Sequence, residues 1–132
     1  MLPSYFKYAQ KASVNSDYKI KLGACILVKG MPISVGWNMR YKTHPLTRKY
    51  HETQTLHSEV MCIVRVKNKE LLKGSTMVVY REDKVFHQPN LSRPCKTCVR
   101  IMYLFGIEKV IYTIPGGYME ENVKDMLPKE ST

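Results

Sequence analysis

Residues 94–114, PCKTCVRIMYLFGIEKVIYTI, decide the fold because they join a helix pattern directly to a strand pattern. Pro94 suits the first turn of a helix, where its missing N–H leaves no hydrogen bond unmade. The apolar residues that follow predict a helix over 95–105, and Gly106 ends it. Residues 108–114 then predict a strand. A helix that leads at once into a strand is typical of sheets with helices packed on their faces.

The rest of the chain repeats this alternation. The spacing of apolar residues predicts three further helices and three further strands, namely helices over residues 4–16, 57–68 and 118–127 and strands over 22–29, 31–37 and 75–81. Lys29-Gly30 fits a tight turn, and Pro32 favours a place near the sheet edge for the strand that contains it. The polar segments 38–56 and 82–94 are expected to be loops. We therefore expect a mixed sheet with helices on its faces.

The composition indicates one ordinary globular domain over residues 1–132. Apolar residues make up 44% and charged residues 24%, which excludes a disordered or collagen-like chain. No apolar run approaches the roughly 18–20 residues that a membrane span needs, so we expect no membrane partner. The first residues lack the features of a signal peptide, and we expect a cytoplasmic protein.

The net charge of +10 is the most unusual global property of the chain. It suggests an anionic partner, which could be a nucleic acid, a nucleotide phosphate or a phosphate-rich surface. The alternative is that lysines scattered over the surface serve only solubility. The composition leaves both interpretations open.

The four cysteines fall into two classes. Cys25 and Cys62 lie in apolar runs and are expected to be small buried side chains. Cys95 and Cys98 form a CxxC pair, a spacing typical of metal or redox sites. Disulfides are not expected, because the cytosol keeps thiols reduced.

A metal site can be built from the CxxC pair and one histidine. Residues at i and i+3 share a helix face, so the sulfurs of Cys95 and Cys98 can reach one ion. His57 begins another predicted helix and offers an imidazole. Two thiolates and one imidazole leave the fourth position of tetrahedral Zn²⁺ open for water, as in catalytic sites. Glu59 is placed to take a proton from that water.

Other interpretations of these residues stay open. His44, His51 or His87 could complete a closed structural zinc site, and a CxxC pair can also serve redox chemistry. The combination is more specific than its parts, since H-x-E followed by P-C-x-x-C is a known signature of zinc nucleobase deaminases.

Residues 20–114 resemble the cytidine and deoxycytidylate deaminase superfamily. The resemblance rests on GWN at 36–38, LHSEV at 56–60, RPCKTC at 93–98 and GIEKVIYT at 106–113. It is greatest to phage-type deoxycytidylate deaminases, in which a basic loop with a THPL-like stretch precedes the histidine. The resemblance implies an α/β class, three-layer α/β/α cytidine-deaminase-like fold with a central mixed β-sheet, and a homo-oligomer.

The resemblance also implies roles for individual residues. Zinc would be held by His57, Cys95 and Cys98, and Glu59 would be the catalytic proton shuttle. Asn38 would bind the substrate sugar, and the backbone of Ser58 would help to hold the base. The family commonly has alanine at the position of Ser58.

Two further departures bear on the substrate. Deaminases of free cytidine usually carry cysteine at the position of His57, which argues against a nucleoside. Transfer-RNA adenosine deaminases typically have glutamate where this chain has Arg93.

The favoured hypothesis is hydrolytic deamination of deoxycytidylate (dCMP) to dUMP and ammonia. Residues 40–49 carry four cations and no acid, and they could hold a 5′-phosphate through charge-assisted hydrogen bonds: Arg40, Lys42, Arg48 and Lys49. A second hypothesis is a deaminase of cytosine or adenine in a polynucleotide, whose bases could stack on Trp37, Tyr41 and Tyr50. The third is a non-catalytic, zinc-stabilised binding module.

Overall fold

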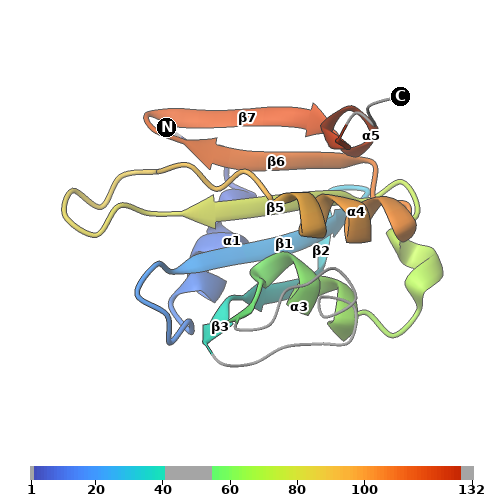
Figure 1. Cartoon of the computed structure of the whole chain (residues 1–132), viewed down its shortest axis with the longest axis horizontal. Coiled ribbons are helices and arrows are strands. Elements are labelled where there is room, and N and C mark those ends of the chain that lie inside the picture. The colour runs from blue at the N-terminus through green and yellow to red at the C-terminus, as the bar shows by residue number, and fades with distance from the viewer. Residues whose placement is uncertain (1, 41–54, 129–132) are drawn as a thin grey trace.

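The chain folds around one five-stranded mixed sheet (Figure 1). The computed structural model describes residues 2–40 and 55–128. The strand order is β2-β1-β5-β6-β7, with only β5 and β6 parallel. These strands are β1 (Leu22–Val28), β2 (Met31–Trp37), β5 (Thr76–Arg81), β6 (Lys109–Ile114) and β7 (Gly117–Asn122). The predicted mixed sheet is confirmed, and the strand that contains Pro32 lies at its edge.

Helices cover both faces of the sheet, which confirms the three-layer α/β/α architecture. The helix α1 (Phe6–Ser13) lies behind the sheet in Figure 1, and α3 (Ser58–Arg65) and α4 (Lys96–Leu104) lie in front. Alternate strand residues face opposite layers, as the pleat requires. Cys25 and Val78 pack with α1, whereas Ile26 and Val79 pack with the helices in front.

The remaining elements are short. A 3₁₀ helix, η1 (Lys69–Leu72), follows α3, and α5 (Val123–Met126) follows β7. The segment expected to be a loop over 38–56 contributes a two-stranded ribbon of β3 (Met39–Arg40) and β4 (Thr55–Leu56). Within the part of the chain that the structure describes, no helix combines the length and the apolar character that crossing a membrane requires.

The predicted helix over 118–127 is wrong for most of its length. Gly116, with φ +81°, turns the chain so that β7 pairs with β6 in antiparallel register. Pairing with an available sheet edge overrides the local preference of this segment. Only Val123–Met126 are helical. The consequence for function is that Glu121 lies on a strand beside Tyr112 rather than on a helix.

Gly36 allows α3 to pack unusually close to the sheet. A Cβ atom at this position would lie 2.5 Å from the Ser58 carbonyl oxygen and 2.8 Å from the Cys62 amide nitrogen. Both neighbours are backbone atoms of α3, so they cannot move without moving the helix. Ser34 adds a hydrogen bond from its Oγ to the Cys62 carbonyl at 2.8 Å. The position of His57 at the start of α3 therefore depends on a glycine in β2.

We predict that Gly36→Ala will destabilise the protein by about 1–3 kcal/mol, because the added methyl group overpacks a tight contact. It should also weaken metal binding, since α3 carries His57. Gly117→Ala is the matched control, because a Cβ there meets nothing within 4 Å. Urea unfolding and zinc titration of both variants measure the effects. Equal stability of the two variants would contradict the role given to Gly36.

Candidate active site

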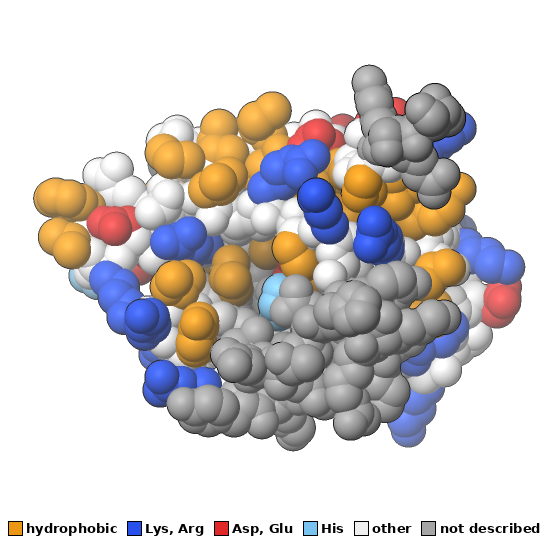
Figure 2. Space-filling model, in the orientation of Figure 1, with side chains coloured by type: hydrophobic (Ala, Val, Ile, Leu, Met, Phe, Trp, Pro, Cys, Tyr) orange, Lys and Arg blue, Asp and Glu red, His pale blue; other side chains and the backbone are white. Residues whose placement is uncertain are grey.

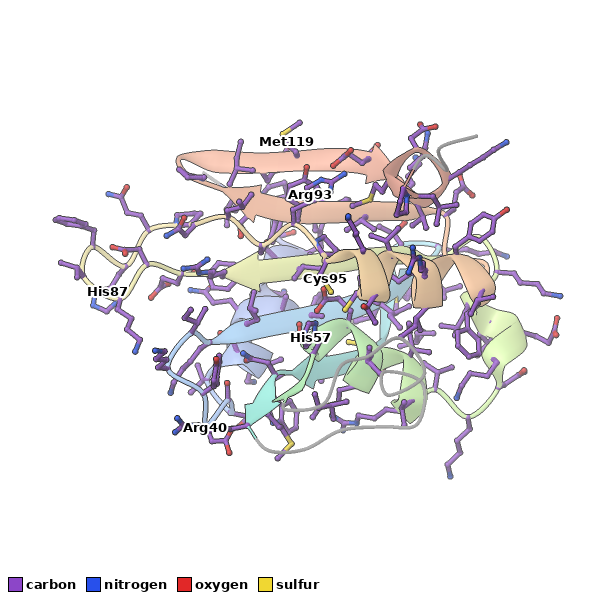
Figure 3. All side chains as sticks on the ribbon, in the orientation of Figure 1. Arg40, His57, His87, Arg93, Cys95 and Met119 are labelled. Atoms are coloured by element: carbon purple, nitrogen blue, oxygen red, sulfur yellow. The ribbon has the colours of Figure 1, made fainter. Side chains whose placement is uncertain are left out.

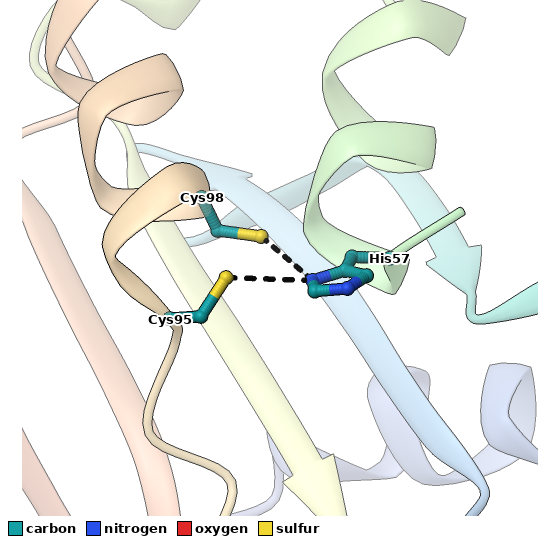
Figure 4. Close-up of side chains that lie close together, drawn as sticks. All are labelled: His57, Cys95 and Cys98. Atoms are coloured by element: carbon teal, nitrogen blue, oxygen red, sulfur yellow. Dashed lines mark hydrogen bonds between the residues drawn. The ribbon is translucent and has the colours of Figure 1, made fainter. Parts of the chain in front are cut away.

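Three side chains predicted to bind metal meet at the starts of two helices. His57 immediately precedes α3, and Cys95 immediately precedes α4, where Cys98 lies in the first turn. The Nδ1 atom of His57 lies 3.2 Å from the sulfur of Cys98 and 3.5 Å from that of Cys95 (Figure 4). Residues from distant parts of the chain thus form one cluster.

The cluster fits zinc in both chemistry and spacing. Its ligand atoms all lie within 4.8 Å of one another. Zinc bonds of roughly 2.0–2.3 Å at tetrahedral angles separate nitrogen and sulfur ligands by about 3.6 Å, close to the observed distances. Among the described residues, no other His, Cys, Asp or Glu belongs to the group. His87 lies in the segment between β5 and α4, away from it (Figure 3), and His44 and His51 fall outside the described residues.

The local environment favours a thiolate at Cys95. A hydrogen bond with the Cys98 thiol, aided by His57, lowers the pKa of Cys95 to about 4, although partial burial opposes the shift. Thiolate is the form that binds metal. Cys25 and Cys62, in contrast, are fully buried, and burial raises the pKa of each thiol. The predicted division of the cysteines into two classes is confirmed.

Glu59 is a buried carboxyl group beside this cluster, with 4% of its surface exposed. Burial raises its pKa, an effect that His57 and the Ser58 hydroxyl partly offset. The Oγ atom of Ser58 donates a hydrogen bond to Glu59 Oε1 at 2.7 Å. A carboxyl group that accepts a proton more readily than a solvated one suits acid–base catalysis.

The cluster opens into a cavity of about 290 Å³. Its described lining combines the expected His57, Glu59 and Cys95 with Leu22 at the start of β1 and Arg81 at the end of β5. The segment between β5 and α4 adds Leu91, Ser92 and Arg93. Sequence reasoning noted Arg93 as a departure from a related family but did not select Arg81, Leu91 or Ser92. Their proximity in sequence to the strand end and to the CxxC pair is the signal that could have identified them.

A buried hydroxyl pair fixes this wall of the cavity. Ser92 Oγ lies 2.8 Å from Thr113 Oγ1 and also donates to the Val79 carbonyl at 3.0 Å. The Thr113 amide donates to Ser92 Oγ at 2.9 Å. Ser92 is therefore tied to the end of β6 and to β5, and the residues beside it are held next to Cys95.

The proposed substrate contacts differ in their surroundings. Asn38 is buried, and its amide bonds the backbone of Leu22 and Ile20. It thereby fixes a cavity residue, and its contacts with the described residues use one of the two side-chain N–H groups and one of the two lone pairs of Oδ1. Arg40 lies near the Tyr18 ring and is not among the residues that line the cavity. Lys42, Arg48 and Lys49 fall outside the described residues.

Comparison with known protein families agrees with this geometry. The model described as the cytidine and deoxycytidylate deaminase zinc-binding region matches residues 2–114. The chain belongs to this family. It is a zinc-dependent hydrolytic deaminase, and its His/Cys/Cys cluster is positioned to bind the ion. No curated protein sequence matches the chain.

Solved structures share the fold at low sequence identity. Cytidine deaminase from Burkholderia pseudomallei is 17% identical, covers 98% of this chain and 100% of its own, and has a TM-score of 0.70. The dCMP deaminase of cyanophage S-TIM5, solved with dCMP and dUMP, is 21% identical. That match covers 83% of this chain and 77% of the phage enzyme, with a TM-score of 0.58. Both likenesses establish the fold.

We predict that His57→Gln will reduce bound zinc from about one ion per chain to a small fraction, because only two protein ligands remain. His87→Gln is the matched control, since His87 is an exposed histidine that pairs with Glu82 away from the cluster. Elemental analysis after gel filtration measures zinc directly. Loss of zinc from the His87 variant, or its retention by the His57 variant, would refute this ligand assignment.

Proposed function

We propose that the protein deaminates dCMP to dUMP and ammonia. The observation that carries this proposal is a single cavity that combines the His57–Cys95–Cys98 cluster, the buried Glu59 carboxyl and two arginines. The first two features suit hydrolytic deamination, and the arginines suit a phosphorylated substrate.

The residues divide the chemistry between them. Zinc bound at the cluster supplies Lewis acidity, which lowers the pKa of water from about 15.7 toward 7. As water adds to C4 of the cytosine ring, Glu59 takes its proton and gives it to N3. The second proton passes through Glu59 to the amine, which leaves as ammonia, and the ring becomes uracil. The buried position of Glu59 protects these transfers from bulk water.

Positioning of the substrate is proposed for the residues around this centre. The backbone of Ser58 would contact the base, and Asn38 would contact the sugar directly or through the backbone of Leu22, which it holds. Arg40, Lys42, Arg48 and Lys49 stay predicted contributors to phosphate binding. A cytoplasmic location and a homo-oligomeric state also stay predictions.

A nucleoside monophosphate as substrate agrees with the net charge of the chain and with the proteins that share its fold. The chain has a net charge of +10. The cyanophage enzyme of the same fold was solved with dCMP and dUMP. The resemblance to deaminases that have histidine rather than cysteine at position 57 supports a nucleotide over a free nucleoside.

A polynucleotide substrate is the second candidate, favoured by the basic surface. On the face shown in Figure 2, Lys and Arg side chains border the central hollow, and acidic side chains are sparse. Binding that depends on many phosphates weakens steeply as salt rises, whereas binding of one phosphate does not. The salt dependence of the Michaelis constant for an oligonucleotide and for dCMP therefore discriminates the two.

We predict that Glu59→Gln will lower the turnover number for dCMP by about 10²–10⁴-fold while zinc stays bound, because an amide cannot shuttle a proton. Glu70→Gln is the control, since Glu70 is a well-exposed residue that pairs with Lys73. Ammonia release is measured with dCMP, CMP, deoxycytidine and a single-stranded oligonucleotide. Full activity of zinc-loaded Glu59→Gln would exclude the proton-shuttle role.

Two other outcomes of the substrate panel would contradict the proposal that dCMP is the substrate. If the zinc-loaded wild-type protein released ammonia from the oligonucleotide but from none of the three small molecules, the polynucleotide hypothesis would replace dCMP. If it released ammonia from no member of the panel, deamination of cytosine compounds of these classes would be excluded.

A further inference from the structure

We propose that Arg81 and Arg93 form the phosphate-binding end of the active-site cavity, and that Glu121 holds Arg93 in position for this task. The inference rests on the proposed function, because it names the part of the substrate that these residues recognise. The ligand group is a phosphate monoester, as in a nucleoside 5′-monophosphate.

The location of the two arginines is the first argument. Both line the cavity that contains His57, Glu59 and Cys95, and they are the only Lys or Arg residues in its described lining. Arg81 ends β5, and Arg93 comes two residues before Cys95. Figure 3 shows Arg93 beside Cys95 and Arg40 well away from it. Among the described residues, the cations that line this cavity therefore come from the end of β5 and from the segment between β5 and α4.

Arg93 is held by a geometry that fixes its orientation. Its Nε donates to Glu121 Oε2 at 2.8 Å, and its Nη2 donates to Glu121 Oε1 at 3.3 Å. Tyr112 donates from its hydroxyl to the same carboxylate. A guanidinium has five N–H donors, so the pairing with Glu121 and a further interaction with Tyr112 leave at least two for a ligand. The Arg93 side chain keeps 42% of its surface exposed, which a phosphate at the mouth of the cavity can reach.

Arg81 is anchored through both its backbone and its side chain. Its amide donates to Thr113 Oγ1 at 3.1 Å, and its carbonyl accepts from the Asn90 amide at 2.9 Å. Its Nη1 donates to the Leu91 carbonyl at 3.3 Å, which leaves most of the guanidinium donors for another partner. Both arginines thus stand on a wall that the buried Ser92–Thr113 pair keeps rigid.

The chemistry of a phosphate monoester matches this pair. Guanidinium groups bind phosphate oxygens through charge-assisted hydrogen bonds, often two at a time. Glu121 neutralises part of the positive charge of Arg93. The negative charge of a phosphate is therefore balanced better by Arg81 and Arg93 together than by either arginine alone. A nucleoside lacks the phosphate and gains nothing from either side chain. The pair therefore determines preference for a nucleotide over the corresponding nucleoside.

The test compares dCMP with deoxycytidine in the zinc-loaded protein. For Arg81→Gln and Arg93→Gln, we expect the ratio of kcat/KM for dCMP to that for deoxycytidine to fall about 10–100-fold, mainly through the KM of dCMP. Glu121→Gln should lower the ratio less, because it loosens Arg93 without removing it. Arg100→Gln, an exposed arginine on α4 outside the cavity lining, is the matched control.

A binding measurement makes the result independent of turnover. Calorimetric titration of dCMP and deoxycytidine into zinc-loaded Glu59→Gln protein, with and without Arg93→Gln, should show the same selective loss of dCMP affinity. An unchanged ratio in both arginine variants, or equal losses for the two ligands, would overturn the inference while leaving cytosine deamination intact. Absence of deamination in the wild type, with arginine-dependent dCMP binding, would instead refute only the proposed reaction.

Discussion

The convergence of two helix starts on one face of the sheet is the constraint on which the site depends. The helices α3 and α4 pack against the same side of the central strands, and their first residues supply His57, Cys95 and Cys98. Gly36 permits the close approach of α3, and the Ser34 hydroxyl secures it. Small changes in this packing would separate ligand atoms that now lie within 4.8 Å of one another.

The same architecture gives each part of the site a different degree of solvent access. Glu59 and the metal-cluster residue Cys98 are buried, whereas His57 and Cys95 are partly exposed. The wall beyond them comes from the segment between β5 and α4, which Ser92 ties to β5 and β6. The protein therefore combines a buried carboxyl group, which we propose transfers protons, with a cavity wall that carries two arginines.

Much of the fold and of the metal site could be predicted from the sequence. The spacing within the H-x-E and CxxC motifs indicates the metal ligands, and the apolar periodicity indicates the helices and strands. The pairing of β7 could not be predicted, since residues 118–122 become a strand only through contact with β6. The hydrogen bond from the Ser58 hydroxyl to Glu59 could not be predicted either, because it depends on side-chain orientation. The sequence did not predict that Arg81 and Arg93 share a cavity, because 11 residues separate them. Tertiary hydrogen bonds, such as those of Ser92 with Thr113 and of the Asn90 amide with the Arg81 carbonyl, bring the two arginines to one wall.

X-ray absorption spectroscopy of the zinc-loaded protein tests the central claim most directly. A site made by His57, Cys95 and Cys98 predicts two sulfur ligands at about 2.3 Å and two nitrogen or oxygen ligands at about 2.0 Å, of which one is imidazole. Addition of a substrate analogue should alter the non-imidazole light ligand and leave the sulfurs unchanged. A signal from two imidazoles, or from three or four sulfurs, would contradict a catalytic site with one open position.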